Sequence, residues 1–458
     1  MLKTIYTLLA LVFIQSFSFT SEAATEFKKD SLIRDAEIED ALKSYIEPIF
    51  EVAGLSKKAA NIYLIINDSP NAMATVDHTI FLQTGLITSN KDVGTILGVL
   101  AHETGHIAGH HIIRGMQEAQ NASLGALAGL ALGAGIAILG GRADASTAVL
   151  AGSSTYLQQS MLSYSRTQES SADQAAKKYL EALGWSCKPL IAFLESLSQQ
   201  ELLSHERQDP YMRTHPLTKE RIEILRTYAK KSPCTTKKPP SRFVNSYARI
   251  RTKIIAYTQR PSSVLQKYDL KGGSIEALYA CAIAHTRLSD FKKSVPLVDR
   301  LLQKHPRDPY FWQFRGDIFF ESGNLSEAAR SYEKASRLSK NPLMKVDLAK
   351  ALLESSAQSN ITKAIDLLTH AIHKDGKNAF AWHLMAVARG KQKQMALMAL
   401  ALAEQNLIIG NPIQVLNQVQ RSRSFINKSP SKSKIADERV KIRLRDIEIE
   451  AQKLIQKN

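Results

Sequence analysis

The segment VLAHETGHIAGHH, residues 99–111, contains four histidines and one glutamate in thirteen positions. It continues the apolar run VGTILGVL, so we predict one helix over residues 92–114. Residues four apart share one face of a helix, which lets the imidazoles of His102 and His106 reach a single cation. Glu103 lies about 100° further round the helix and can reach a water molecule beside that cation. This is the spacing of a zinc site whose glutamate acts as general base, although ordinary helix histidines are the alternative.

A catalytic zinc needs a third protein ligand. His110 and His111 follow on the same helix, but three ligands from one straight helix strain the geometry, so we expect outer or surface histidines there. Glu169 and Asp173, four apart in YSRTQESSADQAAKKYL (164–180), are better placed. Glu169 could complete the metal site while Asp173 accepts the outer N–H of a ligand histidine. A solvated acidic helix face is the alternative interpretation.

Three segments together carry a family resemblance: AHETGH (101–106), YSRTQESSADQAA (164–176) and THPLTKERI (214–222). They resemble the gluzincin peptidases of the HtpX and Oma type, and among them a periplasmic branch with tetratricopeptide repeats behind the peptidase domain. The resemblance implies one zinc ion per chain and assigns roles to the matching residues: metal ligands His102, His106 and Glu169, catalytic general base Glu103, and Asp173 as the acidic residue following the ligand glutamate.

The resemblance also extends to residues outside these ligands. His215 in THPLT matches a histidine that can close onto the zinc as a regulatory plug. The strand pair ahead of the active-site helix implies a substrate that lies extended along residues 71–82 and adds as an extra strand. In that segment the family's usual Phe and Pro-Gly-Gly are replaced by Met73 and by VDH at 76–78.

The pattern around the motif predicts a mostly helical α+β fold. Apolar spacing predicts helices over 34–60 and 156–198, and the β-branched runs NIYLIIND (61–68) and TIFLQTGLI (79–87) predict two strands. We therefore expect a zincin-like metallopeptidase domain with a small sheet. Residues 122–152 are almost wholly Ala, Gly and Leu, which favours a buried or membrane-touching helical hairpin over a membrane span.

The sequence repeats after residue 270. The order Trp312, Gly316, Tyr332 with Asn341-Pro342 fits the 34-residue tetratricopeptide pattern, weaker copies flank it, and a fourth irregular copy contains Trp382. Such units stack into an α-solenoid, because a single helix pair cannot bury its apolar face alone. We expect this repeat domain, 270–420, to bind proteins, with a basic loop and a C-terminal helix over 421–458.

The first 24 residues are typical of a secretory signal peptide. Lys3 precedes an apolar run from Ile5 to Phe19, and Ser21 and Ala23 fit the positions before a cleavage site. An uncleaved anchor is the alternative. The predicted order of domains is a signal peptide at 1–23, the zinc metallopeptidase domain at 24–230 and a basic linker at 231–269, ahead of the repeats.

The chain has 458 residues and a net charge of +17, from 60 basic and 43 acidic residues. An exported chain rarely meets DNA, so nucleic acid is excluded and peripheral contact with an anionic membrane stays open. Between Glu223 and Asp269 there are eleven basic residues and no acidic one. We interpret this stretch as a solvated connector, with a head-group contact as the alternative. Cys187 and Cys234 could form a disulfide, and Cys281 is expected in the core.

These features together predict an exported, periplasmic zinc endopeptidase. From the resemblance alone, its substrates or partners are outer-membrane proteins or their assembly machinery, in quality control or assembly. The alternative is a low-activity chaperone or adaptor of the periplasm that uses the peptidase fold as a scaffold. Neither substrate identity nor cleavage preference nor oligomeric state can be predicted from these motifs.

Overall fold

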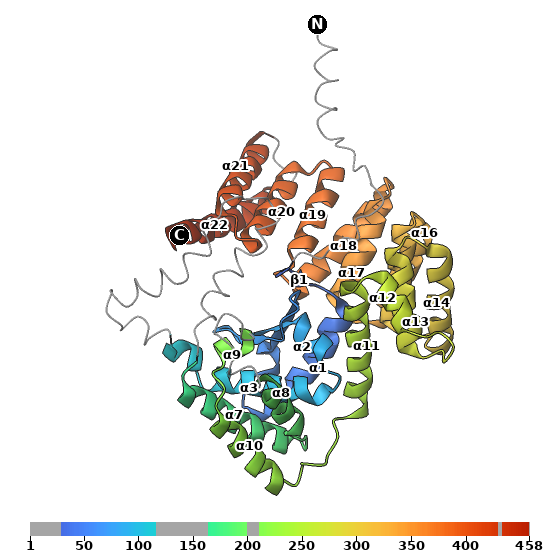
Figure 1. Ribbon diagram of the computed structural model, residues 1–458. Coiled ribbons are helices and arrows are strands. Elements are labelled where there is room, and N and C mark those ends of the chain that lie inside the picture. Colours follow the sequence, from blue (N-terminus) through green and yellow to red (C-terminus); the bar gives the residue numbers. More distant parts are fainter. Residues whose placement is uncertain (1–28, 116–163, 199–209, 429–432, 458) are drawn as a thin grey trace.

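The computed structural model describes residues 29–115, 164–198, 210–428 and 433–457 (Figure 1). The predicted signal peptide and the Ala/Gly-rich stretch at 122–152 lie outside these described residues. Within the described ranges, no helix is both long and apolar enough to cross a bilayer.

A small sheet and the first helices form the core of the N-terminal domain. The sheet has the strand order β1-β2-β4-β3, with β2 and β4 parallel and the two outer strands antiparallel to their neighbours. Its elements and the helices on it are β1 (Leu32–Ile33), α1 (Ala36–Val52), β2 (Asn61–Ile65), β3 (Ala72–Ala74), β4 (Thr79–Gln83), α2 (Thr84–Ser89) and α3 (Val93–Ala108). The two predicted strands are confirmed, but both end earlier than predicted, at Ile65 and Gln83.

The second strand ends at Gln83 because the chain turns there onto a neighbouring loop. The Thr84 hydroxyl donates to the carbonyl of Asn67 and accepts from its amide, at 2.9 and 3.0 Å. Gly85 then lies against the backbone of Asp68, where any side chain would collide. This close contact between the two segments fixes where α2 begins, and with it the direction of α3.

The histidine-bearing helix α3 is buried along its length, from Val93 to Ile107. The Asp92 carboxylate accepts from the Gly94 amide and starts the helix. The helix ends at Ala108, so the prediction of one helix to residue 114 is wrong. His110 has a φ of +52°, which a right-handed helix does not allow. Residues 111–115 begin a separate helical segment.

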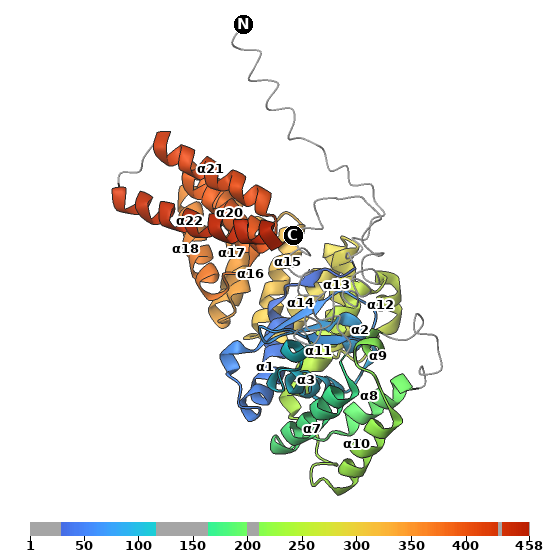
Figure 2. The same cartoon turned by 90° about the vertical axis from the view of Figure 1, so that its left-hand side faces the viewer.

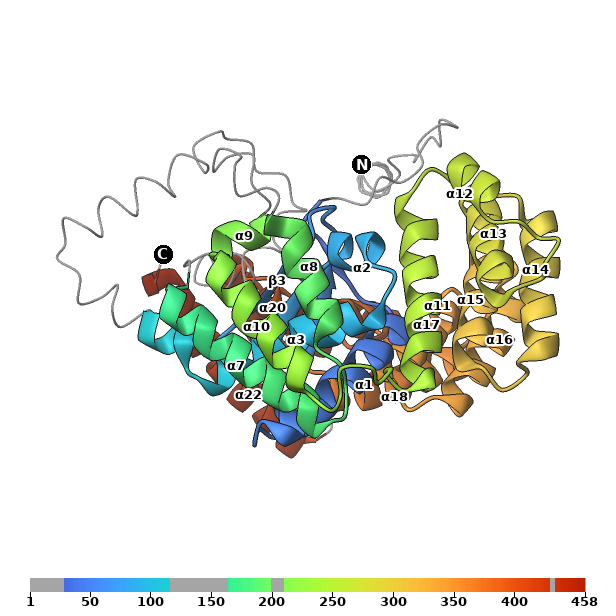
Figure 3. The same cartoon turned by 60° about the horizontal axis from the view of Figure 1, so that its bottom comes forward.

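Helices α7 (Arg166–Ala182) and α8 (Lys188–Ser198) pack on α3, and α10 (Lys219–Lys231) packs on both of them (Figure 3). The short helix α9 (Pro210–Thr214) precedes α10. The helix α7 starts with a capping box in which Ser165 and Gln168 bond each other's backbone amides. Gly105 of α3 lies against Ala172 of α7, and a Cβ there would come 2.9 Å from the Ala172 carbonyl. The glycine lets the two helices approach closely at the site.

The basic stretch at 231–269 is structured, which contradicts a solvated connector. It contains α11 (Ser241–Thr258) and α12 (Pro261–Lys267). On α11, Phe243 and Tyr247 are buried in the core of the N-terminal domain. Composition misled the prediction because two of the basic residues, Arg249 and Lys253, form ion pairs with acids of distant segments instead of facing water.

The C-terminal half is a stack of helix pairs, coloured yellow to red in Figure 2. Its helices are α13 (Ile275–Arg287), α14 (Phe291–Lys304), α15 (Pro309–Glu321), α16 (Leu325–Leu338), α17 (Pro342–Leu353), α18 (Gln358–Lys374), α19 (Ala379–Lys391), α20 (Met395–Ile408), α21 (Pro412–Lys428) and α22 (Lys434–Lys457). In the predicted central repeat, Gly316 leaves room for the ring of Tyr332. The predicted C-terminal helix is confirmed.

The predicted basic loop at 421–434 is wrong over its first eight residues. Residues up to Lys428 belong to α21, where Ser422 and Ile426 are buried. The Ser422 hydroxyl donates to the Ala396 carbonyl of α20 at 2.8 Å. Polar composition suggested a loop, but the apolar spacing of Val415, Val419 and Ile426 makes this segment an amphipathic helix.

Candidate metal centre

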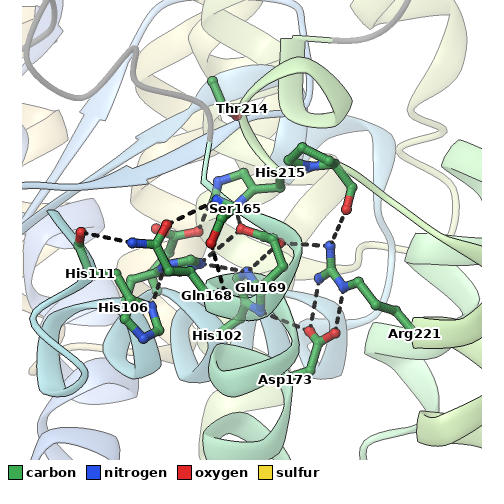
Figure 4. A network of polar contacts seen from close by, with 12 residues as sticks. His102, His106, His111, Ser165, Gln168, Glu169, Asp173, Thr214, His215 and Arg221 are labelled. Atoms are coloured by element: carbon green, nitrogen blue, oxygen red, sulfur yellow. Dashed lines mark hydrogen bonds and ion pairs between the residues drawn. The ribbon is translucent and has the colours of Figure 1, made fainter. Parts of the chain in front are cut away.

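Four buried side chains from three segments converge on one point (Figure 4). His102 and His106 come from α3, Glu169 from the first turn of α7, and His215 follows α9 directly. One ligand atom from each lies within 4.8 Å of the others. The structure therefore brings the three sequence-predicted ligands and the predicted plug, His215, together, although they are up to 113 positions apart in the sequence.

The two imidazoles and the carboxylate meet at close range. The Nε2 atoms of His102 and His106 are 3.1 Å apart. The carboxylate oxygens of Glu169 lie 3.4 Å from the first of these nitrogens and 3.2 Å from the second. Two imidazole nitrogens and a carboxylate are the donor set that a divalent cation such as zinc prefers. Among the residues that the structure describes, this group fits a metal ion.

Outer contacts orient the two histidines. The Nδ1 of His102 lies 3.0 Å from Asp173 Oδ1, so a proton on Nδ1 leaves the Nε2 lone pair facing the centre. The Nδ1 of His106 is 3.0 Å from Nδ1 of His111. The turn that follows the end of α3 brings His111 back towards this position, while His110 is exposed. These positions fit the expectation of outer and surface histidines.

An arginine that the sequence did not single out fixes both acids. Arg221 of α10 contacts Asp173 through Nε and Nη2, at 2.6 and 3.0 Å. Its Nη1 lies 2.7 Å from Glu169 Oε2. The motif THPLTKERI contained this residue, but no local spacing rule brings position 221 to position 173. Its guanidinium is the one arginine or lysine in the described part of this cluster.

Two tyrosines that the sequence did not indicate as site residues also lie at the centre. The Tyr164 ring stacks on His106 with ring centres 3.7 Å apart, and the Tyr211 ring stacks on His215 at 4.5 Å. Both rings are buried. They limit the rotation of these imidazoles and keep water from one side of the centre. A sequence contains no periodic signal for such contacts, because each ring arrives from a different segment.

Glu103 stands beside the centre and is fully buried. Its Oε1 lies 3.5 Å from His215 Nε2, and no described residue gives it a hydrogen bond of good geometry. Burial raises the pKa of this carboxyl, an effect that the charges of His215 and His102 and the Ala74 amide only partly offset. A carboxylate with a raised pKa takes up a proton more readily, as a general base must.

The other two acids behave differently. Burial alone would raise the pKa of Glu169, but the nearby rings of His215 and His102 hold it well below its ordinary value. Burial also opposes ionisation of Asp173, yet hydrogen bonds from His102 and Arg221 lower its pKa. Burial lowers the pKa of His106, so this ring is neutral. Two carboxylates that favour the ionised form, Glu169 and Asp173, therefore lie beside the neutral imidazole of His106.

Comparison with known proteins assigns the domain that holds this centre. Residues 36–229 match the model of "Peptidase family M48", and residues 298–405 match the "Cytochrome c-type biogenesis protein H TPR domain". The chain carries a family M48 peptidase domain. The M48 match spans α3 and α7 together with the segment that bears His215, and the second match lies in the predicted repeats.

The relatives align with most of the chain. The "Beta-barrel assembly-enhancing protease" of Escherichia coli (strain K12) is 23% identical over 402 residues, 86% of this chain and 80% of that protein. The protein of the same name from Yersinia pestis is 24% identical, over 75% of this chain and 71% of that protein. Among solved structures, the "Crystal Structure of the Yeast Tom70" covers 78% of this chain and 88% of that chain with a TM-score of 0.33, too low to establish a common fold.

These findings confirm the family resemblance and the fold class predicted from the sequence. The M48 domain is that of a protease, and a helical repeat domain follows it. The family also implies a metal, which agrees with the His/Glu group at the centre. The roles of the individual residues follow as proposals from their geometry.

Proposed function

We propose that this chain is an exported, zinc-dependent endopeptidase of the periplasm that acts in quality control or assembly of outer-membrane proteins. The convergence of His102, His106 and Glu169 beside Glu103 carries this proposal. The names of the relatives support the assembly role, and the predicted signal peptide supports export. One zinc ion per chain fits the donor set.

His102, His106 and Glu169 would hold the zinc. When bound, the ion supplies Lewis-acid polarisation of the peptide carbonyl and makes water easier to deprotonate. Glu103 then takes the proton from the attacking water onto its carboxylate and returns it to the leaving amine. Asp173 and Arg221 keep the ligands in position from outside, because Asp173 bonds His102 and Arg221 bonds both acids.

The edge of the sheet supports the predicted substrate position. β3 is an outer strand that pairs with β4 alone in the described sheet, and Ala74 on it faces Glu103. An extended peptide that adds to β3 would bring a peptide bond next to the catalytic carboxylate. This geometry supports a substrate that lies extended along residues 71–82, as the resemblance implied.

His215 is positioned to act as the regulatory plug. Its Nδ1 lies 3.0 Å from Glu169 and its Nε2 3.5 Å from Glu103, so the ring fills the space between ligand and base. Its release would open the centre to substrate. The same contacts favour the alternative function, a low-activity chaperone or adaptor in which the centre stays closed.

The repeat domain would supply the protein partners. A cavity of about 1000 Å³ lies between the open face of the sheet, at Tyr63 and Phe81, and the repeat helices at Asp317, Asp347 and Phe380. Its lining contains aromatic and acidic side chains. Anionic membrane contact has less support, because Arg249 and Lys253 of the basic stretch are engaged with Glu37.

Casein cleavage by purified mature protein, with and without zinc, tests the proposal. We expect zinc-dependent cleavage by the wild type, none by Glu103→Gln, and faster cleavage by His215→Ala. The Gln variant should retain the zinc content of the wild type, which separates lost chemistry from lost metal. Equal activity of wild type and Glu103→Gln would refute the peptidase. If the Gln variant also prevents aggregation of an unfolded outer-membrane protein as well as wild type, the chaperone alternative is supported.

A further inference from the structure

Two of the three cysteines lie in segments that contact each other. Cys187 directly precedes α8, and Cys234 lies in the turn that follows α10. The Ser186 hydroxyl donates to the Thr235 carbonyl at 2.9 Å, so the residues next to the two cysteines are in direct contact. Both cysteines are buried, with 4% and 3% of their surface exposed, and both thiols are free in this structure. They are 47 positions apart in the sequence.

Glu181, near the end of α7, holds the turn after α10 in this place. The Cys234 thiol lies 3.7 Å from the Glu181 carbonyl oxygen, and the Gly184 amide donates to the same oxygen at 2.9 Å. The Glu181 carboxylate accepts hydrogen bonds from the hydroxyls of Tyr228 and Ser232. These bonds fix the turn that carries Cys234 against the segment that leads from α7 to α8.

We propose that a disulfide joins Cys187 to Cys234 once the chain is in an oxidising compartment. Such a bond needs Cα atoms roughly 4.4–6.8 Å apart, and two segments in hydrogen-bond contact come near this separation. Cys281 is buried in a different place, the repeat domain, where its thiol donates to the Tyr268 carbonyl at 3.5 Å. In the cell the bond relies on the proposed export for its oxidant, but it does not depend on peptidase activity.

The oxidant is a protein or small molecule that itself contains a disulfide. The thiolate of one cysteine attacks a sulfur of that disulfide, forms a mixed disulfide and releases one thiol of the oxidant. The thiolate of the second cysteine then attacks the protein sulfur of the mixed disulfide, which closes the bond and releases the second thiol. The chain thus loses two protons and two electrons, and the oxidant gains them.

The bond forms while the chain folds. Burial raises the pKa of the Cys187 thiol, and Glu181 and Cys234 add to this effect, so the folded protein disfavours the reactive thiolate. Once closed, the bond encloses a loop that contains α8, α9 and α10, and with them His215 and Arg221. It would fasten this loop beside α7 and limit the freedom of the unfolded chain.

A thiol count tests this pairing in the mature chain, directed by a standard export signal into the periplasm of a bacterial host. The purified protein is denatured in the presence of N-ethylmaleimide, and mass spectrometry counts the modified thiols. We expect one modified thiol in wild type, and three after prior reduction with tris(2-carboxyethyl)phosphine. Cys187→Ala and Cys234→Ala should each show two modified thiols. Cys281→Ala, the matched control, should show none.

Thermal unfolding of the same proteins tests what the bond does. Reduction should lower the unfolding midpoint of wild type and of Cys281→Ala by roughly 5–10 °C, and it should leave the double variant Cys187→Ala/Cys234→Ala unchanged. Three modified thiols in folded wild type would overturn the proposal. So would a bond that includes Cys281, a disulfide between two chains, or an equal shift of the midpoint in the double variant. Because the export signal is supplied, these outcomes do not depend on the chain's own export.

Discussion

The molecule contains two buried clusters of charge, and they are built differently. The first is the metal centre, where Glu103, Glu169 and Asp173 face histidines and a single guanidinium, that of Arg221. The second, which we term the interdomain cluster, consists of Asp35, Glu37, Arg249, Lys253, Tyr279 and Asp308. It joins α1 of the peptidase domain to α11 and to the first repeat helices.

Every acid of the interdomain cluster contacts a permanent cation. Glu37 lies 2.6 Å from Arg249 and 3.3 Å from Lys253, and the Tyr279 hydroxyl donates to it at 2.8 Å. Lys253 also contacts Asp35 at 2.6 Å. Buried charges are tolerated when they are paired and hydrogen-bonded. Such a cluster holds two domains in one arrangement and needs nothing from solution.

The metal centre has too few cations for its acids. Arg221 serves both Glu169 and Asp173, and Glu103 has no arginine or lysine beside it. Its remaining neighbours are imidazoles, which can bind a metal through a lone pair. The composition of a buried cluster therefore separates a structural network from a site that takes a cation. Four substitutions test this difference.

The largest effect should come from Glu103→Gln. Loss of a general base lowers rates by about 10²–10⁴-fold, while the free energy of unfolding should change little because no described residue depends on Glu103 for a good hydrogen bond. Peptide cleavage and urea denaturation measure the two quantities. A large loss of stability with the rate unchanged would place Glu103 in a structural network instead.

Lys253→Met should have the opposite profile. It leaves the buried Glu37 and the half-buried Asp35 with one cation fewer, which costs about 3–5 kcal/mol in unfolding free energy. Zinc content should not change. Lys43→Met is the matched control, since Lys43 is 55% exposed in its side chain and its 4.0 Å pair with Glu47 should contribute under about 1 kcal/mol. Equal losses in the two variants would contradict a structural role for the cluster.

Asp173→Asn should weaken zinc binding by about 10–100-fold, the usual effect of losing an outer partner of a ligand histidine. Competition with a zinc-binding dye measures the affinity. Glu195→Gln on α8, whose exposed carboxylate pairs with Arg226 on the surface, is the control and should bind zinc as wild type does. Unchanged affinity in Asp173→Asn would mean that its contact with His102 has no part in metal binding.

The smallest effect is on acid stability. The charges of Lys253 and Arg249, with the hydrogen bond from Tyr279, overcome burial and keep the pKa of Glu37 below the ordinary 4.5. The stability from this ionised group is therefore complete above pH 4.5 and is lost as the pH falls through the lower folded value. Glu37→Gln should flatten the decline of unfolding free energy below pH 4.5, whereas Glu47→Gln on the same helix should not. An unaltered slope would contradict the assigned pKa direction.

The local geometry of the site could be predicted from the sequence, and its long-range contacts could not. Spacing of four on a helix places His102 with His106 and Glu169 with Asp173 whatever the tertiary fold, so both pairs were predictable. That the two helices would converge on one site was predicted only from the family resemblance. The sequence did not indicate Arg221 or the stacked tyrosines, because these residues reach the centre from other segments. No periodic spacing links those segments to the helix that carries the histidines.

Two errors in the fold have the same origin. The basic stretch around Arg249 and Lys253 was interpreted as a connector because composition shows charges but not their buried partners in α1. The helix was extended past Gly109 because apolar spacing continues there, while the positive φ of His110 becomes visible only in the structure. In both regions tertiary contacts decided what the local pattern left open.

The most direct test of the central claim is the zinc content of purified, extensively dialysed protein, measured by plasma mass spectrometry for wild type, Glu103→Gln and His106→Ala. We predict one zinc per chain in the first two proteins and loss of most of it in the third, with all three folded by circular dichroism. Folded wild type without zinc after zinc loading, or equal zinc in His106→Ala, would contradict the assignment of this cluster as the metal centre.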